Sequence, residues 1–529
     1  MGFKKFLRTL RSKDMYGDYA FDVLPDDSVR IKTYYGNEEN VTIPSSINGK
    51  PVSMIGDNAF NNCRSLKSVT IPDSVVMIGD YAFSKCFSLE DITIPFGVIG
   101  IGCNAFLTCF ALKSITIPDS VIEIDAFAFN GCSSLEEILL SENLEQIGFC
   151  AFGGCSSLES ITIPNSVTGI GEQAFYECSS LTSVTIPDSV TMIENSTFEG
   201  CSSLTNITIP DSVLMIEECA FKGCSSLTNI TIPKSVTTIE NSAFEECSSL
   251  ESITIPDSVT EIGTSVFENC SSLKNIVIPN KVEIIPYRAF YNCPSLESVT
   301  IPDSVCEIHS EAFYKCSSLV RIIIPDSVTS IGYSVFEKCS SLESVTIPDS
   351  ISEIDEKTFY KCSSLVYITI PDSLTYIGTS AFEECSSLES IDIPDSVCYI
   401  QEGAFKGCSS LANISIPSEL KKIEDSVFSK CSSLTNVIIP NDVIEIHSYA
   451  FYKCKSLTSV VIPNNVKRIG PYAFGKCSSL EKIFIPKTAK QIDDTMLVGS
   501  SNAKIHCYNR SFAHQYARER NIEHVIINK

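Results

Sequence analysis

A 23-residue unit recurs along most of this chain, and this period constrains the fold more than any other feature. Cysteine stands at nineteen positions spaced 23 residues apart, from Cys63 to Cys477. Phenylalanine precedes each of these cysteines by three residues and leucine follows each by three, with no insertion between copies. Repeat arrays grow in one dimension and bury the apolar edge of each unit against its neighbours. The period therefore predicts one repeat solenoid of about twenty copies instead of several globular domains.

Each copy predicts a short strand followed by a return path to the core. The pattern Leu66-x-x-Val69-x-Ile71 places apolar side chains on one face of a strand. Pro72 ends the strand because proline lacks a backbone N–H. The Asp-Ser pair that often follows is typical of a turn. The later Ile-Gly-x-x-Ala-Phe segment then leads the chain back to the core.

These two segments resemble the BspA-like subclass of leucine-rich repeats over about residues 41–492. The resemblance implies a β-rich, right-handed solenoid with one continuous parallel β-sheet and an irregular, turn-rich return face. It also implies protein–protein contact and adhesion, because family members are often bacterial or protist surface proteins.

Both ends of the array predict caps that cover the apolar stack. Residues 15–40 predict a β-hairpin, because two strand-like segments flank a turn at residues 25–28. Residues 493–529 predict a β-α-β-like cap with a strand at 504–508, a helix capped by Ser511 and a last strand at 525–527. The predicted domains are a basic leader at 1–14, the two caps, and a solenoid at 41–492 without an internal boundary.

The leader places Phe3, Phe6, Leu7 and Leu10 at helical spacing between basic residues. This pattern fits a solvated terminus or a membrane-touching helix, and the first is favoured. The leader lacks the apolar core of a secretory signal, and no segment approaches the roughly 18 apolar residues of a membrane-spanning helix. The compartment stays open between the cytoplasm and non-classical export, although the resemblance implies the cell surface.

The charge balance bears on partners, since 39 basic residues stand against 64 acidic ones, a formal net charge of −25. An acidic surface repels phosphate backbones and anionic headgroups, so nucleic acids and membrane surfaces are unfavourable partners. Cationic and neutral partners remain open.

The cysteines predict buried free thiols that act as small apolar residues. Equivalent cysteines would lie one strand spacing apart with parallel Cα–Cβ bonds, which opposes the torsion angle of a disulfide. No Cys-x-x-Cys pair occurs, so no zinc site is predicted.

The sequence predicts no catalytic site and no cofactor. His309 and His447 share a repeat position but lie six copies apart, and His506, His514 and His524 fall in the C-terminal cap. Neither a nucleophile elbow nor a glycine-rich phosphate loop occurs. The chain is therefore predicted to be non-enzymatic.

Aspartate follows the proline in ten of nineteen copies, and this column leaves two interpretations. A row of carboxylates could gather Ca²⁺, which prefers oxygen ligands. The favoured interpretation is a turn residue, with no metal predicted. The row includes Asp303, Asp326, Asp349, Asp372 and Asp395.

Binding residues are predicted where outward-facing strand positions depart from their polar background. Two clusters depart from it, and each either contacts a protein partner or reflects drift among residues that suit strands. The first comprises Val320, Arg321, Ile323, Val366, Tyr367 and Asp392, and the second comprises Ile438, Val461 and Phe484.

Together these features predict a scaffold for protein–protein binding, with adhesion to a cell or host surface as its context. A glycan-binding wall made of polar Thr, Ser and Asn columns is the alternative. Ice binding is a minor third hypothesis, since eleven of nineteen copies place Thr in one column, but a curved row fits a flat lattice poorly.

Overall fold

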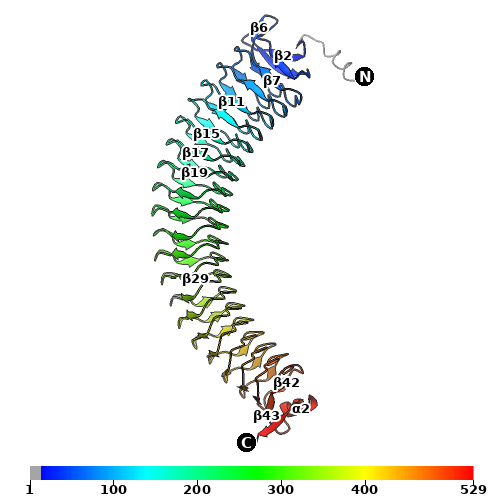
Figure 1. Ribbon diagram of the computed structural model, residues 1–529, viewed down its shortest axis with the longest axis vertical. Coiled ribbons are helices and arrows are strands. Elements are labelled where there is room, and N and C mark those ends of the chain that lie inside the picture. The colour runs from blue at the N-terminus through cyan, green and yellow to red at the C-terminus, as the bar shows by residue number, and fades with distance from the viewer. Residues whose placement is uncertain (1–13, 528–529) are drawn as a thin grey trace, which may run out of the picture. The chain divides into compact units, whose positions relative to one another are not determined.

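Each copy forms one turn of a coil, and most copies contain two short parallel strands and a turn-rich third side. This is the arrangement in a computed structural model that describes residues 14–527 (Figure 1). The first strand lies where the sequence predicts it: in β9 (Asp91–Thr93), Ile92 is buried between two exposed residues. The second strand has only two residues, as in β10 (Gly100–Ile101), where Ile101 is buried. The coil confirms the predicted repeat solenoid and adds a second row of strands to the return path.

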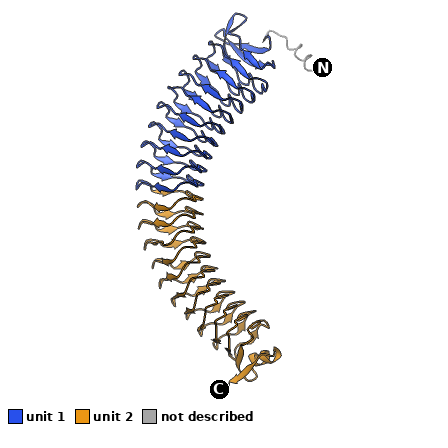
Figure 2. Ribbon diagram, viewed as in Figure 1, with its two compact units in different colours: residues 1–259 blue, residues 260–529 orange. Residues whose placement is uncertain are grey.

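Two compact units make up the chain, Met1–Val259 and Thr260–Lys529 (Figure 2). We call equivalent residues in successive copies a column and name it after its member in residues 63–85. A column therefore holds one residue from each copy.

The first unit contains both strand rows. The first row consists of β4 (Asn40–Thr42), β7 (Ser68–Thr70), β9, β11 (Ser114–Thr116), β13 (Glu137–Leu139), β15 (Ser160–Thr162), β17 (Ser183–Thr185), β19 (Asn206–Thr208), β21 (Asn229–Thr231) and β23 (Ser252–Thr254). The second row consists of β8 (Met77–Ile78), β10, β12 (Glu123–Ile124), β14 (Gln146–Ile147), β16 (Gly169–Ile170), β18 (Met192–Ile193), β20 (Met215–Ile216) and β22 (Thr238–Ile239). Neighbouring strands pair in register, as Ile78 with Ile101 and Ile101 with Ile124.

The second unit repeats this plan. Its first row consists of β25 (Asn275–Val277), β27 (Ser298–Thr300), β30 (Ser344–Thr346), β32 (Tyr367–Thr369), β34 (Ser390–Ile391), β36 (Asn413–Ile414), β39 (Ser459–Val461) and β41 (Lys482–Ile485). Its second row consists of β24 (Glu261–Ile262), β26 (Ile284–Ile285), β28 (Glu307–Ile308), β29 (Ser330–Ile331), β31 (Glu353–Ile354), β33 (Tyr376–Ile377), β35 (Tyr399–Ile400), β37 (Lys422–Ile423), β38 (Glu445–Ile446), β40 (Arg468–Ile469) and β42 (Gln491–Ile492). Single bridges continue the first row where no strand forms, as Arg321 with Ser344.

The parallel ladder of the first row is divided into short segments, whereas the resemblance implied one continuous sheet. In the first unit, β4, β7 and β9 form one ladder, and β11 and β13 form the next. Strands of two or three residues make few hydrogen bonds with each neighbour, so the twist between strands readily interrupts the ladder.

The N-terminal cap confirms the predicted hairpin. β2 (Tyr19–Val23) pairs antiparallel with β3 (Val29–Tyr34), and β1 (Met15–Tyr16) adds to β2. β3 then runs parallel to β6 (Lys50–Ile55), which joins the cap to the second row. β5 (Ser46–Ile47) and β6 form a small antiparallel hairpin. The predicted leader lies outside the described residues apart from Asp14.

The C-terminal cap also confirms its prediction. β43 (Lys504–Tyr508) pairs parallel with β41 on one side and with β44 (His524–Ile527) on the other. Helix α2 (Phe512–Glu519) connects β43 to β44, and the Ser511 side chain accepts a hydrogen bond from the His514 backbone N–H. Ser511 therefore caps the helix as expected.

A column of stacked phenylalanine rings fills the core of both units. In the first unit the ring centroids are 5.1–5.6 Å apart from Phe60 to Phe244. In the second unit they are 5.2–5.8 Å apart from Phe267 to Phe474. Tyr34 of the N-terminal cap stacks on Phe60 at 5.1 Å, so the cap covers the end of the column.

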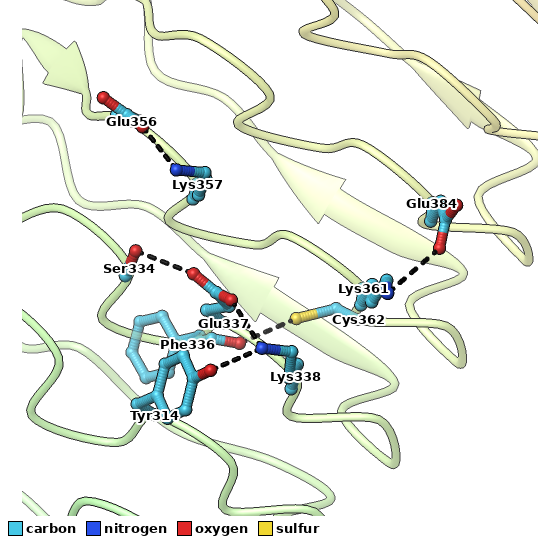
Figure 3. Close-up of polar contacts among 10 residues, drawn as sticks. All are labelled: Tyr314, Ser334, Phe336, Glu337, Lys338, Glu356, Lys357, Lys361, Cys362 and Glu384. Atoms are coloured by element: carbon cyan, nitrogen blue, oxygen red, sulfur yellow. Dashed lines mark hydrogen bonds and ion pairs between the residues drawn. The ribbon is translucent and has the colours of Figure 1, made fainter.

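The cysteine column links each copy to the previous one. The thiol of Cys362 donates a hydrogen bond to the carbonyl oxygen of Phe336 at 3.1 Å (Figure 3), and equivalent cysteines repeat this contact. Where the column reaches the C-terminal cap, Ser500 takes the place of cysteine, and its Oγ donates to the Phe474 carbonyl at 2.7 Å. The thiols are therefore hydrogen-bond donors as well as small apolar residues, and none of the 25 cysteines, all within residues 14–527, forms a disulfide.

The Ser74 column forms a second link between copies. The hydroxyl of Ser212 donates to the carbonyl of Val190 at 2.6 Å, and that of Ser304 donates to the carbonyl of Val282 at 2.7 Å. Serine thus bonds the preceding copy, in addition to lying in a turn as the sequence predicts.

Two columns on the third side adopt left-handed backbone conformations, which strongly favour glycine. In the Lys85 column, Gly131 and Gly154 have φ near +70°, whereas Thr108 has φ +57°. The β-branched Thr108 is strained in this conformation. Its hydroxyl oxygen is also buried without a hydrogen-bond partner among the described residues.

We expect Thr108→Gly to raise the free energy of unfolding by about 0.5–1 kcal/mol, because relief of left-handed strain exceeds the entropy cost of glycine. Thr116→Gly, at an exposed strand position in the next copy, is the control and should destabilise the protein by a similar amount. Denaturant unfolding measures both, and a loss of stability in Thr108→Gly would contradict the strain.

A second prediction concerns the cysteine hydrogen bond. Cys362→Ser should retain more stability than Cys362→Ala, because serine can donate to the Phe336 carbonyl as Ser500 donates to Phe474. Alanine loses the donor and leaves a small cavity, at a cost of about 1–2 kcal/mol. Unfolding midpoints that place alanine level with serine, or above it, would show that the hydrogen bond contributes nothing.

Candidate binding surface

Outward-facing side chains of the first strand row form three columns on one face of the second unit. These are the Lys67, Ser68 and Thr70 columns, and the residue between the last two points into the core. All nine predicted site residues lie in these columns, and all are exposed except the half-buried Phe484. Tyr367, Val461 and Phe484 lie on strands, Arg321 and Ile438 lie at single bridges, and the other four lie beside this row.

Ile438, Val461 and Phe484 occupy the Thr70 column in three neighbouring copies. Strand pairing places Val461 opposite Phe484, and the bridge between Asn436 and Ser459 brings Ile438 beside Val461. Ile438 is 83% exposed and Val461 is 61% exposed. The three side chains form a contiguous apolar strip, which we call the C-terminal row.

The C-terminal row continues onto the cap through two residues that sequence reasoning missed. Phe484 pairs with His506, and their rings lie 4.5 Å apart. His506 in turn pairs with the exposed Val525. The cap strand breaks the 23-residue period, because Lys504 pairs with Lys482 at a spacing of 22 residues. An alignment of the sequence that placed Lys504 on Lys482 would have put His506 next to Phe484 and indicated this extension of the row.

The protonation of His506 decides whether the C-terminal row carries charge. Burial lowers the pKa of His506, and the positive charges of Lys482 and Lys504 lower it further. The imidazole therefore stays neutral at neutral pH, and its ring extends the apolar strip.

The first predicted cluster is divided by a polar copy. Arg321 and Tyr367 flank Ser344 in the Ser68 column, as strand pairing shows. Ile323 is 82% exposed and Tyr367 is 56% exposed, but they lie two copies apart. Asp392 shares the Thr70 column with Ile323 three copies away, about 14 Å along the stack. The structure thus brings the six residues onto one face without joining them into a continuous patch.

The remaining members of this cluster are Val320 and Val366. Both are exposed in the Lys67 column, where Glu343 separates them. The Arg321 guanidinium lies 3.9 Å from the Glu343 carboxylate, and both side chains are largely exposed. Such a pair contributes little stability, so Arg321 can exchange this partner for another at small cost.

Two cysteine thiols and one histidine show how such side chains are held in the stack. Burial raises the pKa of the Cys178 and Cys431 thiols to about 12, so they remain protonated and weakly nucleophilic at neutral pH. The two ring nitrogens of His447 each lie 3.0 Å from a carboxylate oxygen, Nδ1 from Glu424 and Nε2 from Glu445. Among residues 14–527, no group of three His, Cys, Asp or Glu side chains could hold a metal ion.

Aspartates of the Asp73 column accept hydrogen bonds from backbone N–H groups of the next copy. The Oδ1 atom of Asp119 accepts a hydrogen bond from the backbone N–H of Glu142 at 3.1 Å. The Oδ1 atom of Asp395 accepts one from the backbone N–H of Ser418 at 2.9 Å. These aspartates lie in turns as the sequence predicts, but the bonds reach the next copy, whereas the turn interpretation placed them within one turn.

Comparison with known proteins gives a consistent result. Residues 34–512 match, in overlapping segments, the family described as BspA type Leucine rich repeat region (6 copies). A solved leucine-rich repeat protein from Bacteroides ovatus ATCC 8483 is 31% identical, with 82% of this chain and 94% of that chain covered and a TM-score of 0.46. A solved leucine rich cell surface protein from Faecalibacterium prausnitzii A2-165 is 33% identical, with 80% and 93% covered and a TM-score of 0.36. No curated protein matches the sequence.

The lowered pKa of His506 leads to a testable prediction. Lys482→Gln should raise the pKa of His506 toward its ordinary value, because a neighbouring positive charge is removed. An NMR titration of the imidazole measures this pKa, with Lys490→Gln on the second-row side as the control. An unchanged pKa in Lys482→Gln would show that this lysine does not act on the ring.

The lowered pKa of His506 also makes the free energy of unfolding depend on pH. The pKa of His506 is lower in the folded chain than in the unfolded chain, so the unfolded chain takes up the proton first as the pH falls. The contribution of His506 to stability is therefore present above the ordinary histidine pKa and is lost in acid.

Proposed function

Because the chain belongs to the BspA-type leucine-rich repeat proteins, we propose that it is a non-enzymatic scaffold that binds a protein partner through the C-terminal row. The observation that carries the proposal is the apolar strip itself. Most copies place threonine in this column, whereas three neighbouring copies place Ile438, Val461 and Phe484 there. Contiguous exposed apolar residues on a soluble surface are typical of interaction sites.

The energetics of the row favour a partner. Full burial of one exposed Ile, Val or Phe side chain contributes about 1.5–3 kcal/mol. Val461 and Phe484 lie on paired strands and Ile438 forms a single bridge with Ser415, so little conformational entropy is lost on binding. Leu139 and Val277 are also exposed in this column but have no apolar neighbour in it, and isolated exposed apolar residues are ordinary.

The first predicted cluster, around Arg321 and Tyr367, which we call the central cluster, supplies a second set of contacts on the same face. Tyr367 and Arg321 are the residue types that concentrate binding energy in protein interfaces. A partner seated on the C-terminal row and reaching along the face would meet them next.

The cell surface is the location that we propose for this interaction. The relative from F. prausnitzii is described as a cell surface protein, and this supports the same location here. No helix among residues 14–527 is long and apolar enough to cross a membrane. Protease treatment of intact source cells tests the location: the protein should be cleaved, and its full protection would contradict the proposal.

A capture experiment tests the role of the C-terminal row. The variant Ile438→Thr, Val461→Thr, Phe484→Thr restores the residue most common in the column and removes the apolar strip. Immobilised protein is exposed to an extract of the source cells, and retained proteins are quantified by mass spectrometry. The variant should retain its partner at least about tenfold less than the wild type, because three buried apolar contacts are lost.

The matched control is Leu139→Thr, Val277→Thr, which changes the same column outside the row. It should retain the same proteins as the wild type. A further variant, Tyr367→Ser, measures the contribution of the central cluster. Identical retention by the wild type and the triple variant would reject the row as a binding site.

A further inference from the structure

An open groove of about 790 Å³ runs along the third side of the second unit. It is lined by the residues directly before and after the invariant cysteines in seven neighbouring copies, from Asn292 to Lys430. Six strand spacings give it a length of about 29 Å. A groove this long, lined by equivalent positions of successive copies, suits a linear polymer better than a small molecule.

Lysines of the Lys85 column form the basic wall of the groove. Four of them line it, Lys315, Lys338, Lys361 and Lys430, and Glu384 is the one acidic residue among the lining side chains described. This local excess of positive charge stands out in a chain with a net charge of −25. We call the site the lysine groove.

Tyrosine rings contact three of these four lysines. The Tyr314 ring contacts the ammonium groups of Lys315 and Lys338 at 5.4 and 4.6 Å, and the Tyr360 ring contacts that of Lys361 at 5.2 Å. Figure 3 shows Lys338 between Tyr314 and Glu337, with Lys361 directed toward Glu384. A cation fixed over a ring loses less entropy when it binds an anion.

The charges of the lysines are only partly balanced. Lys338 lies 2.9 Å from Glu337, which is buried, and Lys361 lies 3.7 Å from Glu384. Among residues 14–527, no carboxylate lies within ion-pair distance of Lys315 or Lys430, and both are exposed. Neighbouring copies are about 4.8 Å apart, well inside the screening length of about 8 Å, so adjacent ammonium groups repel one another. A bound polyanion would relieve this repulsion.

Serine hydroxyls form the other wall, and they donate to carbonyls of the preceding copy, which leaves oxygen lone pairs for a ligand. Each hydroxyl donates a hydrogen bond to the backbone carbonyl of the equivalent serine one copy earlier, at 3.3–3.4 Å. The donors are Ser340, Ser363 and Ser386. Each oxygen keeps lone pairs that can accept a hydrogen bond. The lining therefore favours a ligand with anionic groups for the lysines and closely spaced donors for the serines.

These two requirements separate the classes of linear anion. A phosphodiester linkage brings acceptors but no donor to the serines. An extended acidic peptide presents equivalent groups on one side every second residue, at about 6.6–6.8 Å, which does not match a step of about 4.8 Å. A polysaccharide carries hydroxyl donors on every sugar along its length. We propose that the lysine groove binds a linear acidic polysaccharide, through its anionic groups on the lysines and its hydroxyls on the serines.

Binding to polygalacturonate and to heparin tests the proposal and distinguishes a carboxylated from a sulfated ligand. The variant Lys315→Asn, Lys361→Asn, Lys430→Asn keeps Lys338 beside its buried partner. Asparagine suits the left-handed backbone, since Asn62, Asn269 and Asn292 occupy this column with φ between +56° and +64°. Loss of three charges should weaken calorimetric binding of the preferred polysaccharide about tenfold.

The control Lys421→Thr, Lys467→Thr, Lys490→Thr removes the same charge from the second-row side, where Thr329 and Thr375 occupy the same column. It should change affinity by less than about twofold. Glu384→Asn should tighten binding by about two- to fivefold, because it removes a negative charge and frees Lys361. This gain cannot arise from unfolding.

Several results would overturn the proposal. Absence of binding to both polysaccharides would reject the site. An equal loss in the control variant would show a general charge effect, and unchanged affinity in Glu384→Asn would show that the ligand lies elsewhere. Polyglutamate or single-stranded DNA bound as tightly as the polysaccharide would reject the class of ligand. The lysine groove and the C-terminal row are separate, so the threonine variant of the row should bind polysaccharide normally.

Discussion

The contact of each residue with its equivalent in the next copy is the constraint on which this structure depends. A side chain inside the stack must pack against a copy of itself at about 4.8 Å, the spacing of parallel strands. Phenylalanine meets this requirement by parallel stacking, with centroids 5.4 Å apart between Phe359 and Phe382. Cysteine and serine meet it by donating to a carbonyl of the previous copy, as Cys362 and Ser212 do. A buried charge would meet its own like charge, so interior columns stay apolar or neutral.

The same constraint explains which parts of the fold the sequence predicts. A column that must match itself recurs at a fixed interval, so the 23-residue period, the first strand and the cap positions can be read from Cys63 to Cys477. The second strand row cannot be predicted in this way. Its strands have two residues, and in β12 only Ile124 is buried, which leaves no alternation to detect. The hydrogen bond of the thiol is also invisible, because its acceptor is a backbone carbonyl 26 residues earlier.

Side chains that face solvent need not pack against their equivalents in the next copy, and the candidate sites lie at these positions. The sequence predicts which columns face solvent, so it locates Ile438, Val461 and Phe484 as departures from threonine. It does not predict the extension to His506 and Val525, because the cap follows a different spacing. The lysine groove is harder still. Its residues surround the invariant cysteine, and only the left-handed turn on the third side brings them together as one wall.

Contact between equivalent side chains of neighbouring copies also determines how much free energy a column of charged residues costs. A row of threonines stacks without penalty, whereas a row of lysines places like charges within one screening length in every step. The stack limits that cost in three ways: tyrosine rings beneath the ammonium groups, the buried Glu337, and the interruption of the row at Glu384. Any ligand that supplies negative charge at this spacing removes the remaining repulsion along the whole row at once. Affinity for a polymer should therefore rise more steeply with its length than the sum of single contacts, until the ligand spans the groove.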